Sequence, residues 1–196
     1  GVRINHMTST KGIFAVVGVG AIGSRHLQGI CKLKFPSNVY AVDPLASSLA
    51  VAEQRVKEIL TRGRNIDITV EYSTDLSILP SVLDVAVIAT SSMSRLEALL
   101  GLLRHSRTKH VVLEKIAFPS RRAFQTAKAA LETGKATAWV NCARRMNPAY
   151  QFLRGLIAGK NMRMKVAGKN YGLACNAIHF IDLFAFLTRS REYSMD

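Results

Sequence analysis

Long apolar runs are missing from this chain of 196 residues, in which no stretch approaches the roughly 20 consecutive apolar residues that cross a membrane. No signal peptide opens the chain, so neither secretion nor a membrane partner is indicated. Cysteine is rare, and Cys31, Cys142 and Cys175 are far apart and form no Cys-x-x-Cys pair. This spacing indicates neither a disulfide framework nor a zinc site, and it fits a metal-free protein of the reducing cytoplasm.

Acidic residues are scarce, and they are scarcest in the second half of the chain. Residues 1–100 contain 10 Lys and Arg against 8 Asp and Glu, whereas residues 101–196 contain 17 against 5, and the formal net charge is +14. A basic half suits an anionic partner, either nucleic acid or a phosphorylated small molecule. The cations are dispersed through helical patterns without a helix-turn-helix or zinc-finger signature, which disfavours nucleic acid. A missing acidic segment is a second explanation of the imbalance.

Short β-branched runs alternate with helical periods between Gly12 and Asn141. This alternation predicts an α/β fold of the Rossmann type, which is a doubly wound parallel sheet with crossover helices. The expected strands cover 13–18, 38–43, 67–71, 84–90, 109–113 and 137–141. The expected helices cover 21–33, 46–61, 94–104 and 119–133, with a short turn near 75–80. Gly134 stands where the last of these helices needs a left-handed residue.

The first expected strand leads directly into a glycine-rich turn. The apolar run Ile13–Val17 is followed by Gly18-x-Gly20-x-x-Gly23 and then by a helical pattern. In a dinucleotide site, Gly18 permits the tight turn, Gly20 lets the backbone approach a pyrophosphate, and Gly23 lets helix and strand pack closely. The motif alone is weak, but its strand-turn-helix context is the one that dinucleotide binding requires.

The first turn of the expected helix supplies main-chain hydrogen-bond donors. The N–H groups of Ala21, Ile22 and Gly23 have no acceptor within the helix. Together with the helix dipole they attract anions, so we expect them to bind the phosphates of the dinucleotide.

Asp43 ends the second expected strand, twenty residues after Gly23. This is the spacing of the acid that accepts hydrogen bonds from the adenosine ribose. A carboxylate there repels a 2′-phosphate, and residues 44–48 contain no Arg or Lys to bind one. The sequence therefore favours NAD over NADP as the cofactor. The alternative is that Asp43 is only a turn residue before Pro44.

A polar stripe crosses the apolar helix expected at 174–188. Cys175, His179 and Asp182 are spaced four and then three residues apart, which places them on one helical face. His179 can accept a proton from a substrate hydroxyl, because the unperturbed pKa of histidine lies near neutrality. The alternative is a core histidine whose hydrogen bond is supplied by Asp182.

Two cationic sites complete the candidates. Lys115 follows an apolar strand, at the edge where open α/β sheets bind ligands, and its ammonium could stabilise a developing alkoxide. Alternatively it is a strand-end lysine whose ammonium reaches water. Arg145, with Arg144, could bind an anionic substrate, or the two could be a solvated pair before a helix.

In order and spacing, these motifs resemble the glucose–fructose oxidoreductase and inositol dehydrogenase family (Gfo/Idh/MocA) over about residues 12–190. Four further stretches carry the resemblance. They are Asp84–Thr90 (the family's fourth strand), Leu113–Lys115 (its Glu-Lys-Pro motif), Asn141–Pro148 (its arginine-rich stretch) and Ala177–Asp182 (its active-site helix).

The resemblance implies an NAD-dependent oxidoreductase that transfers hydride between nicotinamide and a secondary hydroxyl of a sugar, cyclitol or nucleotide sugar. Thr90 would lie under the nicotinamide ribose, and Glu114 and Lys115 would border the nicotinamide. Lys115 would polarise the hydroxyl and His179 would accept its proton. The substrate would contact Arg145, Cys175, Asn176 and Asp182.

The pattern also predicts the domain organisation. Residues 1–11 are interpreted as a tag remnant and N-terminal tail, with Met7 as the native start, and residues 12–142 as the NAD-binding domain. Residues 143–196 would begin an α+β substrate domain, with a helix at 148–158 that Gly159 ends, a polar strand at 162–166 and the apolar helix. Family members continue into a long antiparallel sheet that commonly forms the subunit interface. The resemblance therefore implies a fragment of a homo-oligomeric protein.

Two positions depart from the family pattern. Cys175 stands where the family usually has an aspartate, four residues before His179, and Ile116 replaces the proline after Lys115. A thiol does not replace a carboxylate as a proton relay. A non-catalytic NAD-binding sensor or regulatory paralogue is therefore the alternative function.

Overall fold

The computed structural model describes residues 11–61, 66–170, 172–190, 192 and 194. The described chain forms two compact units, and the division falls between Val140 and Asn141. The predicted domain boundary lies two residues further along the chain. Of the expected tag remnant and tail, all but Lys11 lie outside the described residues.

The first unit is built on a six-stranded parallel sheet in the order β3-β2-β1-β4-β5-β6. The strand order reverses between β1 and β4, and open α/β sheets bind ligands at such a switch point. The prediction of a doubly wound, Rossmann-type α/β fold is thereby confirmed. The strands are β1 (Gly12–Val17), β2 (Ser37–Val42), β3 (Ile68–Ser73), β4 (Val82–Ile88), β5 (Arg107–Leu113) and β6 (Thr137–Val140).

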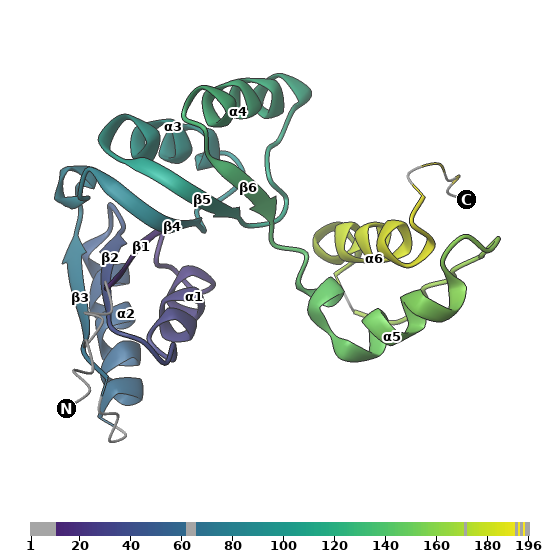
Figure 1. The fold of residues 1–196 in the computed structure, drawn as a ribbon, viewed down its shortest axis with the longest axis horizontal. Coiled ribbons are helices and arrows are strands. Elements are labelled where there is room, and N and C mark those ends of the chain that lie inside the picture. The colour runs from purple at the N-terminus through teal and green to yellow at the C-terminus, as the bar shows by residue number, and fades with distance from the viewer. Residues whose placement is uncertain (1–10, 62–65, 171, 191, 193, 195–196) are drawn as a thin grey trace, which may run out of the picture. The chain divides into compact units, whose positions relative to one another are not determined.

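Helices cover both faces of this sheet. Figure 1 shows α1 and α2 on one face and α3 and α4 on the other, and each pair of helices is in contact. Two apolar clusters fill the layers between helices and sheet. The helices are α1 (Gly23–Ile30), α2 (Ala46–Leu60), α3 (Arg95–His105) and α4 (Arg121–Thr133), with the short helix η1 at Leu76–Ile78.

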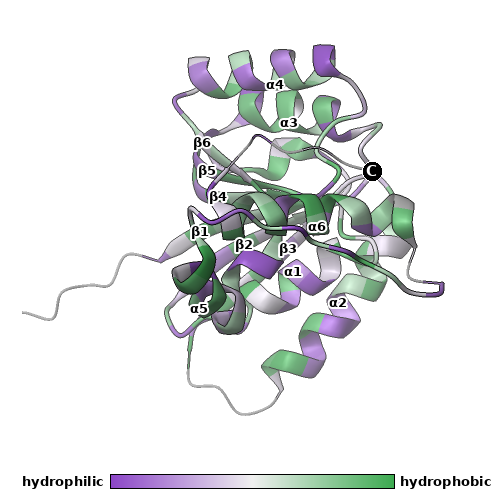
Figure 2. Ribbon diagram, turned by 90° about the vertical axis from the view of Figure 1, so that its right-hand side faces the viewer, coloured by the Kyte–Doolittle hydropathy of each residue, from purple (hydrophilic) through white to green (hydrophobic). Residues whose placement is uncertain are grey.

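The burial of the strands explains their apolar composition. Ala15 and Val16 on β1 and Ala86 and Ile88 on β4 are completely buried, because helices cover both faces of the central strands. Figure 2 shows hydrophilic and hydrophobic stretches alternating along α2 and α4, as expected for helices that present one face to the sheet and one to water.

The end of α4 corrects one expectation. At its start, the Ser120 hydroxyl caps the helix by accepting a hydrogen bond of 3.1 Å from the Ala123 N–H. At its end, however, Gly134 keeps a right-handed conformation with φ −75°. The left-handed residue is Lys135, with φ 53°. The prediction for Gly134 is wrong by one residue: α4 ends at Thr133 as expected, but Gly134 continues the right-handed turn as the C-cap, and the left-handed residue comes one position later.

The second unit contains two helices and a short helical turn: η2 (Ala143–Met146), α5 (Pro148–Ile157) and α6 (Leu173–Thr188). Asn147 caps α5 by accepting a 2.9 Å hydrogen bond from the Ala149 N–H. Arginine side chains lie on the phenyl rings of α6, with Arg144 4.5 Å from the Phe180 centroid and Arg154 4.5 Å from the Phe186 centroid. Cation–π contacts of this kind add to the apolar packing of the unit.

The polar strand expected at 162–166 is absent, and those residues have no regular structure. An isolated strand is not stable without a partner, and the described part of the second unit offers none. Gly159, by contrast, ends α5 as predicted, with φ 78°. No described helix combines the length and apolarity needed to cross a membrane, and α6 has only 16 residues.

Asp84 joins three strands by its carboxylate. It accepts a 2.9 Å hydrogen bond from the Ile13 N–H on β1 and a 2.7 Å hydrogen bond from the Lys109 ammonium on β5. These two donors hold the pKa of the Asp84 carboxyl below its ordinary value, with Lys109 the larger cause. A depressed pKa means that the ionised form stabilises the fold.

We expect Asp84→Asn to lower the free energy of unfolding by about 1 kcal/mol at pH 7, since the side chain is a third exposed. The difference from the native chain should be complete above about pH 4 and should shrink as pH falls and the folded carboxyl is protonated. Urea unfolding at several pH values measures it. Glu53→Gln, which removes an exposed pair with Lys57, is the control, and an equal loss in both variants would contradict this account.

Candidate functional site

The three glycines of the turn after β1 differ in the space around them. At Gly18, where φ is 85°, an added Cβ would lie 2.7 Å from the Thr90 nitrogen, and at Gly23 it would lie 1.7 Å from the Gly18 carbonyl oxygen. At Gly20 an added Cβ would meet nothing within 4 Å. Gly18 and Gly23 are therefore required by the packing of this chain, whereas the space at Gly20 is open to a ligand.

The main-chain donors before α1 face this open space. Gly20, Ala21 and Ile22 are exposed, and no side chain caps the start of α1. Among the described residues, the N–H groups of these three residues have no hydrogen-bond acceptor. Exposed amides at the start of a helix are suited to phosphate oxygens. The chain thus fits the pyrophosphate of a dinucleotide at the place that the sequence indicates.

Asp43 lies at the end of β2, beside the same turn, and is 7% exposed. One carboxylate oxygen accepts a 2.8 Å hydrogen bond from the Val19 N–H, and the other accepts a 2.9 Å bond from the Leu45 N–H. The bond to Leu45 is the contact expected if Asp43 were only a turn residue before Pro44. The bond to Val19 goes further, because it connects the end of β2 to the glycine turn. A carboxylate offers about four lone-pair sites, so each oxygen keeps one for a ribose hydroxyl.

Glu114 and Lys115 follow β5 at the same sheet edge. The Glu114 carboxylate is 2.7 Å from the His26 ring nitrogen Nε2 on α1 and accepts a 3.2 Å hydrogen bond from the Lys115 N–H. Only 6% of Glu114 is exposed. The pairing between His26 and Glu114 was missed by sequence reasoning, because 88 residues separate the two and His26 belongs to no motif that points to Glu114.

Arg95 organises the loops after β4 and β5. Only 2% of Arg95 is exposed, and its guanidinium donates hydrogen bonds to the carbonyls of Thr90 and Ile116, and to that of Ala117 at 3.1 Å. Burial lowers the pKa of Arg95, and the nearby Glu114 carboxylate opposes that shift. Sequence reasoning gave Arg95 no role, and no periodicity or spacing marks an arginine that binds carbonyls of another loop.

The sequence-predicted residues of the second unit lie on α6 and η2. Asp182 forms a two-pronged ion pair with Arg145, in which Nε lies 2.6 Å from Oδ2 and Nη2 contacts Oδ1. This pair raises the pKa of the Arg145 guanidinium. The expectation that Arg145 binds substrate must allow for this pairing, because Asp182 already occupies the edge of the guanidinium formed by Nε and Nη2.

The remaining predicted residues of α6 are placed less specifically. Cys175 is exposed, and the Asn176 amide donates a 3.3 Å hydrogen bond to the Gly172 carbonyl of its own helix start. His179 is partly exposed and lies on the helical face shared by Cys175 and Asp182. The face is thus formed as predicted, but its carboxylate binds an arginine.

Neither a protein-family model nor a curated relative matches this chain. Solved structures do match. They include the WlbA dehydrogenase from Chromobacterium violaceum in complex with NADH and UDP-GlcNAcA (TM-score 0.64, 19% identity, 92% of this chain and 56% of that one). The UDP-N-acetylglucosamine 3-dehydrogenase GnnA from Acidithiobacillus ferrooxidans also matches (TM-score 0.67, 17% identity, 93% of this chain and 56% of that one).

A third similar structure is a super-repressor mutant of Gal80p from Saccharomyces cerevisiae (TM-score 0.67, 18% identity, 92% of this chain and 53% of that one). At such identities the likeness establishes a shared fold. The chain spans just over half the length of each of these three structures.

The space around the glycines predicts different effects for three alanine substitutions. Gly23→Ala should destabilise the fold by about 3 kcal/mol or more, because a Cβ cannot lie 1.7 Å from a carbonyl oxygen. Gly20→Ala and Gly29→Ala meet no atom and should change stability by no more than about 1 kcal/mol. Urea unfolding of the three variants decides this, and an undisturbed Gly23→Ala protein would contradict the packing described.

Arg95→Met should lower the free energy of unfolding by about 3 kcal/mol, because it leaves three carbonyls without their buried donor. Arg95→Lys should lower the free energy of unfolding by less, since a lysine ammonium can donate hydrogen bonds to some of the three carbonyls. Arg104→Met, on the same helix but exposed, should change stability by less than about 0.5 kcal/mol. Equal unfolding midpoints for the Arg95→Met and Arg104→Met variants would show that the loop does not depend on Arg95.

Proposed function

We propose that this chain is the nucleotide-binding part of an NAD-dependent oxidoreductase of the Gfo/Idh/MocA type. Hydride would be transferred between nicotinamide and a secondary hydroxyl of a sugar, cyclitol or nucleotide sugar. The observation that supports this best is the turn between β1 and α1. It combines open space at Gly20, three exposed amides without an acceptor among the described residues, and the Asp43 carboxylate beside them.

Cofactor binding follows from these parts. The amides of Gly20, Ala21 and Ile22 would bind the pyrophosphate, and the free lone pairs of Asp43 would accept hydrogen bonds from the adenosine ribose. NAD is favoured over NADP, because a carboxylate repels a 2′-phosphate and residues 44–48 contain no cation. Thr90, Glu114 and Lys115 end or follow β4 and β5 at the same edge of the sheet and would border the nicotinamide half.

The chemistry divides between cofactor and protein. When bound, nicotinamide supplies a carbon that accepts or gives up hydride. The Lys115 ammonium would donate a hydrogen bond to the reacting oxygen and stabilise its negative charge. The His179 imidazole would take the hydroxyl proton during oxidation and return it during reduction. Cys175 and Asn176 would border the substrate, while Asp182 would act by holding Arg145.

The substrate class rests on the similar structures and on charge. The Chromobacterium violaceum structure contains NADH and UDP-GlcNAcA, and a phosphorylated or nucleotide-linked sugar would suit the basic second half of this chain.

A regulatory, non-catalytic NAD-binding protein is the second candidate. Cys175 is exposed where an aspartate is usual in the family, and Asp182 is occupied by Arg145. One of the similar structures is a repressor, Gal80p. This candidate shares the cofactor site and differs only in the absence of turnover.

Calorimetric titration of the chain with NAD and NADP tests the shared part. We expect NAD to bind at least about tenfold more tightly than NADP, because the Asp43 carboxylate opposes the extra phosphate. Gly20→Ala should weaken NAD binding by about tenfold or more, since its Cβ fills the space that the pyrophosphate approaches. Gly29→Ala, on the same turn-helix segment, should bind NAD normally.

Turnover with a panel of sugars, cyclitols and nucleotide sugars separates the two candidates. His179→Ala should lower kcat by about two orders of magnitude or more, with NAD affinity unchanged. NAD binding without turnover of any substrate in the panel would favour the regulatory candidate. If the folded chain binds neither NAD nor NADP, both candidate functions are overturned.

A further inference from the structure

The amino-terminal half of β5 borders a hollow at the end of the sheet where its strands begin, whereas the glycine turn lies at the end where they finish. β6 begins to pair with β5 only at His110, which lies beside Thr137. β5 itself begins at Arg107, so its first three residues extend beyond its neighbour. A hollow of about 390 Å³ lies beside these residues, bordered also by the ends of α3 and α4. The hollow therefore exists because β6 is shorter than β5.

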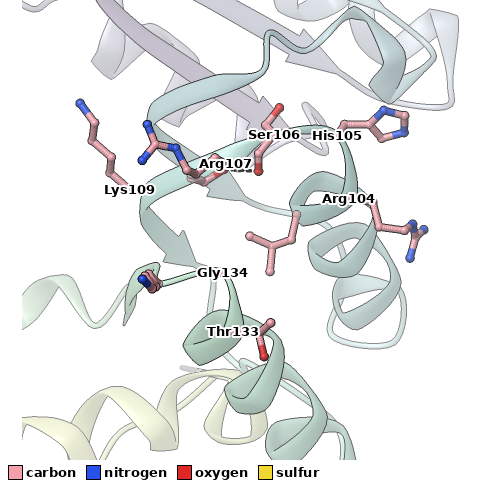
Figure 3. Close-up of a pocket in the computed structure, with 10 residues that line it drawn as sticks. Arg104, His105, Ser106, Arg107, Lys109, Thr133 and Gly134 are labelled. Atoms are coloured by element: carbon pink, nitrogen blue, oxygen red, sulfur yellow. Dashed lines mark hydrogen bonds between the residues drawn. The ribbon is translucent and has the colours of Figure 1, made fainter.

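Cations dominate the rim of this hollow, and none of its lining residues is Asp or Glu. Figure 3 shows the side chains of Arg107 and Lys109 extending from β5 on one side, and those of Arg104 and His105 extending from the end of α3 on the other. The same view places Thr133 and Gly134, at the end of α4, along a third side. Lys135 completes the lining next to them.

The cations are not equally available to a ligand. Lys109 is paired with Asp84 at 2.7 Å. The Arg104 guanidinium lies back along α3, 3.7 Å from where a Cβ on Gly101 would be. Arg107 and Lys135 are exposed, and neither forms an ion pair with any described carboxylate. These two side chains are the available donors.

Helix dipoles reduce the positive charge but do not cancel it. The ends of α3 and α4 each contribute about half a negative charge. Arg104, Arg107 and Lys135 together outweigh these ends and leave about two positive charges at the hollow. A phosphate group carries a charge of about −1.5 to −2 at neutral pH, which matches this excess.

The backbone at Lys135 adds an independent observation. Lys135 adopts φ 53°, a left-handed conformation that costs a side-chain-bearing residue about 1–2 kcal/mol relative to glycine. Its N–H donates a 3.1 Å hydrogen bond to the Glu132 carbonyl, which fixes the residue at the end of α4. The chain thus holds a lysine, at a cost in stability, where a glycine would be favoured and where the side chain borders the hollow.

From this geometry we propose that the hollow binds a phosphate group, either free or carried by a small molecule, through Arg107 and Lys135. The planar guanidinium of Arg107 can donate two parallel hydrogen bonds to phosphate oxygens, and the Lys135 ammonium supplies a point charge. No Phe, Tyr or Trp lines the hollow, so it offers no stacking surface for bases, which disfavours single-stranded nucleic acid. The site lies away from the glycine turn and does not depend on NAD binding.

The test is a titration of the isotope-labelled chain with inorganic phosphate and with a sugar phosphate at constant ionic strength, followed by the NMR shifts of backbone amides. We expect saturable shifts at residues 104–109 and 133–135, with millimolar or tighter affinity. The combined variant Arg107→Gln and Lys135→Gln should weaken binding by about tenfold or more. Lys57→Gln with Lys128→Gln removes the same charge from exposed positions elsewhere in the unit and should leave the affinity unchanged.

The positions of the shifted amides also distinguish this site from the cofactor site. Phosphate bound at the cofactor site would change the NMR shifts of residues 20–24 instead. Shifts confined to residues 20–24, equal responses to chloride, or equal weakening in both double variants would overturn the proposal. Tighter binding of a single-stranded oligonucleotide at residues 104–109, falling steeply with salt, would assign the surface to nucleic acid and also overturn it.

Discussion

The Gly18 carbonyl oxygen lies where residue 23 would otherwise place a methyl group. This close approach determines how the chain passes from β1 to α1, and therefore which main-chain amides face outward. If the helix began further from the strand, the N–H groups of Gly20, Ala21 and Ile22 would not be presented together beside Asp43. The candidate site thus depends on the absence of one side chain.

Several buried polar contacts then fix the loops at the same sheet edge to one another. Asp43 connects the end of β2 to the turn after β1, and Glu114 connects the end of β5 to α1 through His26. Arg95 connects the loops after β4 and β5. Buried hydrogen bonds of this kind hold the loops in place, because each buried group has few alternative partners. A rigid edge is what a ligand site needs, since binding then costs little ordering of the protein.

The sequence predicted the parts whose causes are local. The glycine turn, the alternation of strands and helices and the end of α5 at Gly159 depend on residues close together in the chain, and they were predicted to within a few residues. The pairing of His26 with Glu114, of Arg145 with Asp182 and of Arg95 with distant carbonyls depends on the fold, and no spacing in the sequence encodes it. The expected strand at 162–166 had the right composition, but composition cannot supply a pairing partner.

Asp43 has a structural role in the turn and a proposed role in cofactor binding, and one carboxylate serves both. Its carboxylate holds the Val19 and Leu45 amides and, under the proposed function, also selects the coenzyme. A replacement that could accommodate a 2′-phosphate, such as arginine or serine, would leave at least one of those amides without its acceptor at a buried position. Under the proposed function, coenzyme preference and the integrity of the turn therefore depend on the same side chain, and a variant designed to bind NADP would need a compensating acceptor for these amides.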